Sequence, residues 1–414
     1  EKCNKYMLSL KRMCDKEYII VDNCGTFPAS LSACFSYMQK FLDKHKKNPV
    51  CDEMMDFFFK VRHFLNMYDC ADDKYVTYAE LDKDGDMLLH LYCVDPSENI
   101  SLRLSQGKAS VMFSATFLPV NYFKEMISGD ISDYAVYAHS PFDTSNKRVI
   151  VGRDVSSRYT RRNINEYTKI ADYIRKMVTS RHGRYMIFFP SYSYMQSVYD
   201  IYIKKYENTI LELSAALNDE NLNDENTAKK GQEQQKEQPE KQEEKEQQKE
   251  YEGKTVYNII KQPSNMKEAD KESFLSLFVE NEKTDIAGFC VLGGIFSEGI
   301  DLRGDALIGV AVVGTGIPMV CRQRNILRDY FDSHGKNGYQ YAYVYPGMNK
   351  VLQAAGRVIR TDNDKGIILL LDDRFLTKEY ELQYPREWDK IYPCDASCVS
   401  EYIDDFWKGM TADD

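Results

Sequence analysis

The chain of 414 residues lacks any uninterrupted apolar run of about 18 residues, the length that a membrane-crossing helix needs. Its eleven cysteines include no Cys-x-x-Cys pair, and their odd number excludes a framework in which every thiol is paired. Reduced thiols are typical of cytoplasmic proteins, so we expect that location. Cys3, Cys14, Cys24 and Cys34 are spaced too widely for a usual iron–sulfur pattern, and we expect no metal site in this chain.

Two patterns that hold ATP phosphates and magnesium in motor proteins are also absent. The best match to Gly-x-x-x-x-Gly-Lys-Ser/Thr is Gly253-Lys254-Thr255, which has Gln248 at the position of the first glycine. The pair Asp52-Glu53 is followed by two methionines, so no Asp-Glu-x-His occurs. The chain begins at Glu1 with neither Met nor a signal peptide, which suggests an excised fragment. We therefore expect only part of an ATP site.

The net charge of −10 looks unfavourable for a nucleic-acid binder, but the acids are unevenly distributed. Residues 219–252 form a low-complexity run of Glu, Gln and Lys with a net charge of −6, which leaves −4 for the rest of the chain. This run lacks apolar residues that could offset the entropy of ordering, so we interpret it as a surface insertion. A mildly acidic protein can still line a groove with basic residues, and charge neither proves nor excludes DNA binding.

The most informative segment that is present runs from Gln353 to Arg360, with the pattern Gln-x-x-Gly-Arg-x-x-Arg. On a helix, positions three and four apart share a face, so Gln353, Arg357 and Arg360 would point the same way. Two guanidinium groups on one face fit a phosphate chain, because arginine keeps its charge and offers a planar fork of donors. When the motif is considered by itself, a solvated helix face that happens to carry two arginines explains it about as well as a phosphate site does.

Three other segments place small or hydroxyl-bearing residues just after a predicted strand. They are Ser110–Pro119, Phe188–Met195 and Gly293–Leu302. Such loops present backbone N–H groups and hydroxyls at the edge of a parallel sheet where ligands usually bind. Each also has a plainer interpretation. Ser114 and Thr116, or Ser191 and Tyr192, could do no more than cap a turn or a helix. Residues 297–301 could be an ordinary acidic turn.

Taken in order with Gln353–Arg360, these segments resemble motifs III, IV, V and VI of superfamily 2 helicases of the XPD/DinG type, with the closest likeness to bacterial DinG-like proteins. The resemblance covers about residues 95–395, apart from the low-complexity insertion. It implies an α/β fold: a RecA-like parallel sheet flanked by helices and preceded by a mainly helical, arch-like region. We expect residues 1–104 to form the arch-like region with a small hairpin, and residues 105–414 to form the second RecA-like motor domain.

The resemblance also implies roles for individual residues. Arg357 and Arg360 would be catalytic as arginine fingers, and Gln353, Gly356, Glu298, Gly299 and Asp301 would bind nucleotide. The residues implied for DNA binding are Ser114, Thr116, Ser191, Tyr192, Arg324 and Arg328. Arg324 and Arg328 lie four positions apart on a predicted helix, and an ordinary solvent-facing basic surface is their alternative interpretation.

The function that the resemblance implies is the C-terminal half of an ATP-dependent DNA helicase that moves 5′ to 3′ on single-stranded DNA. ATP and Mg²⁺, and an iron–sulfur cluster if there is one, would belong to the full-length parent, and the isolated chain would be inactive. Its partners would be single-stranded DNA and the missing N-terminal RecA-like domain. The alternatives are a nucleic-acid translocase that does not separate strands, and a motor-like binding module without catalysis.

The sequence predicts six strands for the main sheet and a separate antiparallel hairpin. The hairpin would pair Lys74–Leu81 with Asp86–Val94 around a turn at Asp82–Gly85. A further strand is expected at Thr255–Ile260. The six main strands are expected at Ser110–Ala115, Arg184–Phe189, Asp285–Leu292, Ala306–Val313, Tyr339–Tyr345 and Gly366–Leu371.

Overall fold

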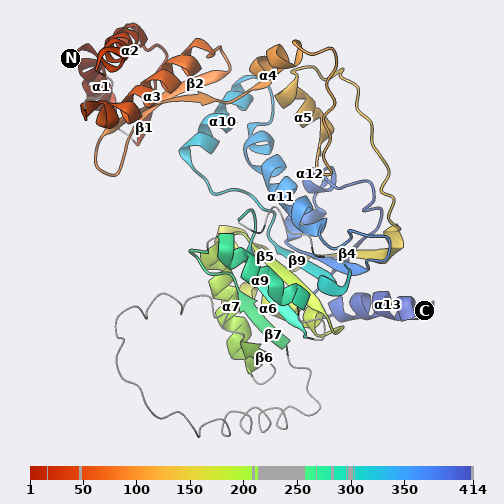
Figure 1. Cartoon of the computed structure of the whole chain (residues 1–414). Helices are drawn as coiled ribbons and strands as arrows, with labels where there is room; N and C mark the ends of the chain where they lie inside the picture. The colour runs from red at the N-terminus through yellow and green to blue at the C-terminus, as the bar shows by residue number, and fades with distance from the viewer. Residues whose placement is uncertain are drawn as a thin grey trace, which may run out of the picture. The chain divides into compact units, whose positions relative to one another are not determined.

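The computed structural model describes residues 1–15, 17–45, 49–207, 210–212, 257–266, 268–280, 284–294, 296, 302 and 304–411. The chain forms two compact units (Figure 1). Unit 1 contains residues 1–135 and 319–342, and unit 2 contains residues 136–318 and 343–414. The border expected at residues 104/105 falls inside unit 1. The low-complexity insertion at 219–252 lies outside the described residues.

Unit 1 is mainly helical and includes one small antiparallel sheet of order β1-β2-β3. The strands β2 and β3 form the expected hairpin, with Tyr75 opposite Cys93 and Leu81 opposite Met87. Asp82 begins the turn by accepting hydrogen bonds from the N–H groups of Asp84 and Asp86. The elements of unit 1 are α1 (Lys2–Met13), β1 (Tyr18–Ile20), α2 (Phe27–Lys44), α3 (Val50–Asp69), β2 (Tyr75–Leu81), β3 (Met87–Cys93), α4 (Ser97–Leu104), α5 (Val120–Ile127) and α10 (Arg322–Ser333).

Small apolar clusters hold the described part of unit 1 together. One joins α2 to α3 through Leu31 and Val61. Another places Ile326 of α10 against Tyr78 of the hairpin. Helix α10 is therefore tied to the hairpin by packing, although more than 200 residues separate them in the sequence.

Unit 2 is built on an eight-stranded sheet of order β11-β4-β10-β9-β5-β8-β7-β6, in which every pairing is parallel. Strand β10 is central and aligns Ile368 with Val149 of β4 and with Val310 of β9. The strands are β4 (Lys147–Gly152), β5 (Arg184–Phe189), β6 (Ile210–Glu212), β7 (Tyr257–Lys261), β8 (Ile286–Val291), β9 (Gly309–Val313), β10 (Gly366–Leu371) and β11 (Ile391–Cys394).

Helices cover both faces of this sheet, which explains why the inner strands are continuous apolar runs. The face that carries Tyr185, Ile187 and Phe189 of β5 packs against α6, α7 and α13 in one large core. On the other face, the ring of Phe278 in α9 lies so close to Gly288 that a Cβ there would be 2.8 Å away. The helices of unit 2 are α6 (Ile164–Val178), α7 (Tyr192–Tyr206), α9 (Glu268–Glu280), α11 (Tyr345–Ala355), α12 (Lys378–Glu381) and α13 (Val399–Thr411), and its short helical turns are Thr144–Asn146, Tyr159–Arg161, Gly304–Ala306 and Asp373–Leu376.

The structure confirms the predicted fold class and most of the predicted strands. Arg184–Phe189 and Gly366–Leu371 match β5 and β10 at both ends. The strand expected at Asp285–Leu292 is β8, and the one expected at Thr255–Ile260 is β7. The strand expected at Ala306–Val313 begins later, at Gly309, because Gly304–Ala306 form a helical turn.

Two predicted strands are wrong. Residues 110–115 have no strand pairing, and Val111 and Phe113 are 86% and 90% exposed. Residues 340–344 form a π-helical turn that continues into α11, where Pro346 stands in the first turn of the helix. The run Tyr339–Tyr345 is therefore helical throughout rather than a strand.

Candidate nucleotide and nucleic-acid site

The loops that follow β4, β5 and β9 meet at the carboxyl edge of the sheet in unit 2, and the loop after β5 carries the predicted site residues Ser191 and Tyr192. A Cβ added to Gly314, just after β9, would lie 2.5 Å from Ser157 Oγ in the loop after β4 and 3.9 Å from Pro190 after β5. Gly316 and Gly347 of α11 approach equally closely, since a Cβ on Gly316 would lie 2.4 Å from the Gly347 carbonyl oxygen. Four chain segments therefore converge here with no room for side chains at the crossings.

The segment Gln353–Arg360 is only partly helical. Helix α11 ends at Ala355, with Gly356 as its C-terminal cap, so Arg357 and Arg360 do not continue the helix. The expectation that one helix face carries Gln353, Arg357 and Arg360 is therefore wrong. Arg357 is buried at 4% exposure, whereas Arg360 is exposed in the loop that follows.

The backbone of that loop is fixed by the carboxylate of Asp364, which is itself 3% exposed. One carboxylate oxygen accepts from the backbone N–H groups of Arg360 at 2.6 Å and Thr361 at 2.8 Å. The other accepts from the Thr361 hydroxyl at 2.6 Å and from the backbone N–H of Gly304 at 3.0 Å. Asp364 thus anchors the Arg360 backbone and links it to the segment before β9.

Arg357 lies on the inner side of the site, near the end of β8. Burial raises the pKa of the Cys290 thiol, and the positive charge of Arg357 opposes that rise. Burial likewise raises the pKa of Tyr192, and Cys290 adds to the rise. Cys290 therefore lies within electrostatic range of both Arg357 and Tyr192, the first residue of α7.

Gln262 connects the start of α7 to the end of β8, and sequence inspection missed it. It is 2% exposed and donates from Nε2 to the Tyr192 hydroxyl at 2.6 Å. Its Oε1 accepts from the Val291 backbone N–H at 2.8 Å, two residues before Gly293. The only signal in the sequence is a polar residue two positions after the predicted strand Thr255–Ile260.

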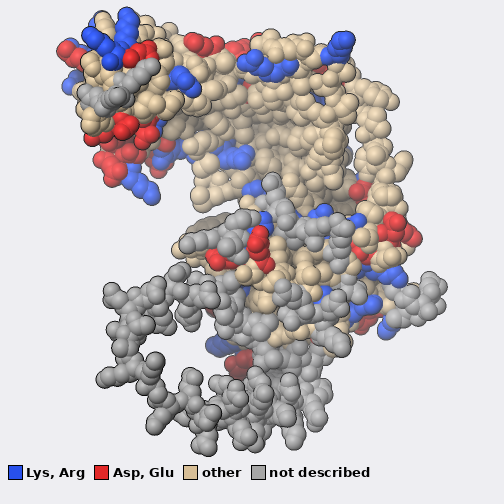
Figure 2. Space-filling model, viewed as in Figure 1, with Lys and Arg blue, Asp and Glu red and all other residues tan. Residues whose placement is uncertain are grey.

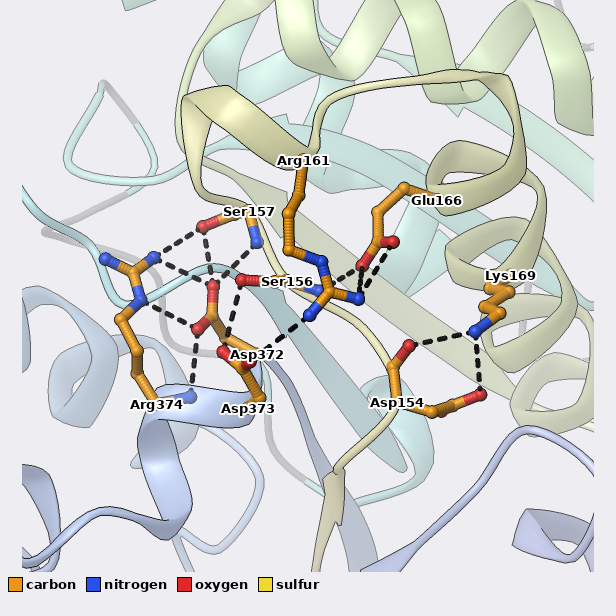
Figure 3. Close-up of polar contacts among 9 residues, drawn as sticks. All are labelled: Asp154, Ser156, Ser157, Arg161, Glu166, Lys169, Asp372, Asp373 and Arg374. Carbon is orange, nitrogen blue, oxygen red and sulfur yellow. Dashed lines mark hydrogen bonds and ion pairs between the residues drawn. The ribbon is translucent and has the colours of Figure 1, made fainter.

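A second network of polar residues surrounds Asp372, after β10 (Figure 3). Arg374 donates to both Asp372 oxygens, from Nε and Nη2, at 2.8 Å each. Ser157 donates its backbone N–H at 2.8 Å and its hydroxyl at 2.7 Å to the same carboxylate. Burial by itself raises the pKa of Asp372, but the bonds and charge of Arg374 and the bonds from Ser157 outweigh burial, so its pKa lies below the ordinary value.

Ser191, Ser114 and Thr116, three of the predicted hydroxyl residues, are engaged in local turns. Ser191 is the N-cap of α7 and accepts from the Tyr194 N–H at 3.2 Å. In unit 1, Ser114 accepts from the Thr116 N–H at 3.1 Å, and the two hydroxyls lie 3.3 Å apart. These capping contacts agree with the plainer interpretation of each motif, and a ligand contact in addition stays a prediction.

The other predicted residues divide between unit 1 and undescribed segments. Arg324 donates to the Ala342 carbonyl at 3.0 Å, and Arg328 pairs with Asp329 at 2.7 Å, both on α10 and its surroundings. Arg328 therefore has a carboxylate beside it rather than standing as a lone positive charge. Glu298, Gly299 and Asp301 lie outside the described residues.

Figure 2 shows Lys and Arg interspersed with Asp and Glu on the visible face, with no broad field of one sign. None of the described segments holds three or more His, Cys, Asp or Glu side chains grouped so as to bind a metal ion. Within the same residues, no helix is long and apolar enough to cross a membrane.

An eight-stranded parallel sheet between helices, with polar loops meeting at its carboxyl edge, defines a RecA-like α/β domain. A family model described as the helicase C-terminal domain matches residues 174–391, more than half of the chain. The chain therefore belongs to this helicase family, and the XPD/DinG-type resemblance is confirmed.

Three known proteins illustrate the similarity. The ATP-dependent DNA helicase DinG of Photobacterium profundum is 34% identical over 89 residues, which are 21% of this chain and 13% of that protein. The 3′-5′ exonuclease DinG of Staphylococcus saprophyticus is 24% identical over 315 residues, 74% of this chain and 28% of that protein. A solved structure of apo XPD shares the fold with a TM-score of 0.50 and 17% identity over 95% of this chain and 69% of that one. The chain thus spans well under a third of these two DinG relatives.

Proposed function

We propose that this chain supplies the C-terminal motor half of a longer ATP-dependent DNA helicase of the XPD/DinG type. The family match to residues 174–391 and the similarity to a protein named as an ATP-dependent DNA helicase support this proposal. ATP hydrolysis, DNA unwinding and 5′ to 3′ movement would be properties of the parent protein. The chain by itself would hydrolyse no ATP, since it has neither the phosphate cradle nor the Asp-Glu-x-His motif.

The observation that carries the proposal is Arg360, an exposed arginine whose backbone is anchored by the buried Asp364. In the parent, the first RecA-like domain would hold the triphosphate and Mg²⁺. Closure of the two motor domains would bring Arg360 to the γ-phosphate, where its charge stabilises the transferred group. Gln353, Gly356 and the loop with Glu298, Gly299 and Asp301 would line the nucleotide, and Arg357 would add positive charge from the interior.

We propose that the DNA path uses Ser191 and Tyr192 in unit 2, and Ser114, Thr116, Arg324 and Arg328 in unit 1. Hydroxyls, backbone N–H groups and arginines are the usual partners of nucleic-acid phosphates. Alternate opening and closing of the motor domains, while one of them holds the DNA backbone, would produce stepping along single-stranded DNA. The partners would be single-stranded DNA and the parent's N-terminal RecA-like domain, and the compartment would be the cytoplasm.

The test is Arg360→Ala in the purified parent protein. We expect kcat for ATP hydrolysis to fall about a thousandfold, a barrier increase of about 4 kcal/mol, with single-stranded DNA binding nearly unchanged. Arg103→Ala, which removes an exposed arginine of α4, is the control and should leave both measurements near wild type. Normal ATP hydrolysis with lost DNA binding would instead move Arg360 into the DNA groove.

A second candidate is a motor that travels on nucleic acid without separating strands. The relative from Staphylococcus saprophyticus, which aligns with 74% of this chain, is named as an exonuclease rather than a helicase. A parent that hydrolyses ATP on single-stranded DNA but leaves a forked duplex paired would favour this candidate. A parent without upstream phosphate-cradle and Asp-Glu-x-His motifs would favour a non-catalytic binding module.

A further inference from the structure

The loop between β4 and α6, residues 153–163, combines a fixed stem with an exposed tip, which we call the Arg158–Arg162 surface after its end residues. The stem residues Ser156 and Ser157 are 0% and 6% exposed. Their backbone N–H groups donate to the carboxylates of Glu166 and Asp372. Two buried acids therefore hold the stem in place, so the tip that it carries is preorganised.

The tip presents an aromatic ring to solvent. Tyr159 is 84% exposed, in contrast to Tyr173 and Tyr185 of the neighbouring core, which are 0% exposed. Because the Tyr159 ring stays in contact with water, it adds almost no buried apolar area to the fold. Packing therefore does not account for this aromatic residue. A solvent-facing ring on a preorganised loop is a platform on which another flat group can stack.

Three arginines lie within three positions of Tyr159 in the sequence, and they have different surroundings. Arg161 turns inward between Glu166 and Asp373, with N–O distances of 3.3 Å to each (Figure 3). Its positive charge is therefore balanced by two carboxylates of the same chain. Arg158 and Arg162 make no ion pair with any carboxylate that the structure describes, and both are exposed.

Arg162 is nevertheless held in position. Its Nε donates to the Ser157 carbonyl at 3.2 Å. Its guanidinium lies 5.5 Å from the ring centre of Tyr159 and 4.9 Å from that of Tyr194. Tyr194 belongs to the first turn of α7, which begins after Ser191. Cation–π contacts thus connect the exposed ring to the helix start that we assign to the DNA path.

We propose that the Arg158–Arg162 surface binds single-stranded nucleic acid, with a base stacked on Tyr159 and phosphates held by Arg158 and Arg162. Proteins that bind single strands combine an aromatic stacking platform with unpaired cations that follow the backbone. The loop supplies both within five residues and adds a firm stem. This assignment rests on the proposed function, and it extends the DNA path from Ser191 and Tyr192 to a loop that no sequence motif marked.

The test uses the 414-residue chain and a fluorescent 20-nucleotide oligo-dT in an anisotropy titration at low salt. Tyr159→Ala should weaken binding about 5-fold to 150-fold, the range expected for one lost stacked base. Tyr159→Phe, which keeps the ring, should bind as the wild type does. The matched control is Tyr134→Ala, which removes a tyrosine that is 93% exposed elsewhere and should change nothing.

The arginines have a separate measurement. Arg158→Ala and Arg162→Ala should each reduce the slope of log affinity against log salt by about 0.7, the value for one lost phosphate contact on a single strand. Arg103→Ala should leave the slope unchanged. Repeating the titration with oligo-U separates DNA from RNA as the preferred strand.

The outcomes separate this inference from the proposed function. Oligo-dT binding that is equal in wild type and Tyr159→Ala overturns the inference and leaves the proposed function standing. A wild-type chain that binds no single strand overturns both. Competition by ATP alone, lost in Tyr159→Ala, would make the surface a nucleotide site and would also overturn the inference. Circular dichroism confirms that each variant folds before it is scored.

Discussion

Two loops of unit 2, one at the carboxyl edge of its sheet and one at the amino edge, are each held by a buried aspartate, and the two aspartates are balanced differently. The loop between β4 and α6 is held by Asp372, whose charge is matched by the guanidinium of Arg374. The loop between α11 and β10 is held by Asp364, whose bonds to described residues come from neutral N–H and hydroxyl groups. Both aspartates fix the backbone of a loop, but among the described residues only Asp372 also forms a buried ion pair.

The difference suggests a division of labour. A buried ion pair is costly to break, because removal of one partner leaves the other charge unpaired. A carboxylate bound to neutral donors can be weakened in smaller steps, because each bond contributes about 1 kcal/mol. We therefore expect the loop with Tyr159 to be the firmer one, and the loop with Arg360 to be the one that can adjust when a nucleotide arrives.

The largest expected effect is at Asp372. Asp372→Ala leaves Arg374 and the Ser157 N–H without their acceptor, so the free energy of unfolding should fall by about 3–5 kcal/mol. Urea denaturation followed by circular dichroism measures this loss. Asp373→Ala is the matched control from the same turn: its carboxylate is 28% exposed and its ion pair with Arg161 is longer, at 3.3 Å, so the loss should stay near 1 kcal/mol. Equal losses at the two positions would contradict the comparison.

The second-largest effect is expected at Gly314, where the segment after β9 crosses the loop between β4 and α6. Gly314 has φ +80°, and a Cβ there would meet Ser157 Oγ at 2.5 Å, so Gly314→Ala combines backbone strain with a clash. We expect a loss of about 2–4 kcal/mol in the same denaturation assay. Gly335→Ala separates the two causes, because Gly335 has φ +73° with nothing within 4 Å and should cost only about 1–2 kcal/mol of strain. If both variants lose the same free energy, Ser157 yields to the added methyl group.

The third effect concerns Asp364. Asp364→Asn replaces one acceptor oxygen by a donor, which then faces either the N–H groups of Arg360 and Thr361 or the Gly304 N–H and the Thr361 hydroxyl. The loss of unfolding free energy should be about 1–3 kcal/mol. In the parent protein, ATP hydrolysis should fall while single-stranded DNA affinity stays constant, because the arginine is misplaced rather than removed. Asp362→Asn, an exposed change two residues earlier, should leave both quantities at wild-type values.

The smallest effect is a pH dependence. Because the pKa of Asp372 is lower in the folded chain than its ordinary value of 3.8, ionised Asp372 stabilises the fold at neutral pH. That contribution is lost as pH falls below the ordinary value through the folded pKa. The difference in unfolding free energy between wild type and Asp372→Asn should therefore shrink between pH 5 and pH 3. A difference that stays constant over this interval would mean that charge contributes little to the pair.

The contrast between correct and incorrect strand predictions has a physical reason. Gly366–Leu371 was predicted with both ends correct, because an apolar run that is buried on both faces needs no further information. Strand β11 was missed because Pro393 lies in it, and the sheet accepts that proline because β11 is an edge strand. The run at 110–115 has the composition of a strand, yet no neighbouring strand in the described chain pairs with it.

The sequence by itself determined the family, the order of the motifs and the parallel α/β architecture, because these follow from local apolar runs and from fixed spacings such as Gln353–Arg360. Only the tertiary structure decided which polar groups act together. Asp364 and Gly304 are sixty residues apart, and Ser157 and Asp372 more than two hundred, so no local pattern could pair them. Nor could spacing show that α11 ends at Ala355, which leaves Arg357 buried and Arg360 in solvent. The burial of Arg357 and the hydrogen bond from the Arg360 backbone to Asp364 make that distinction, and both depend on the tertiary structure.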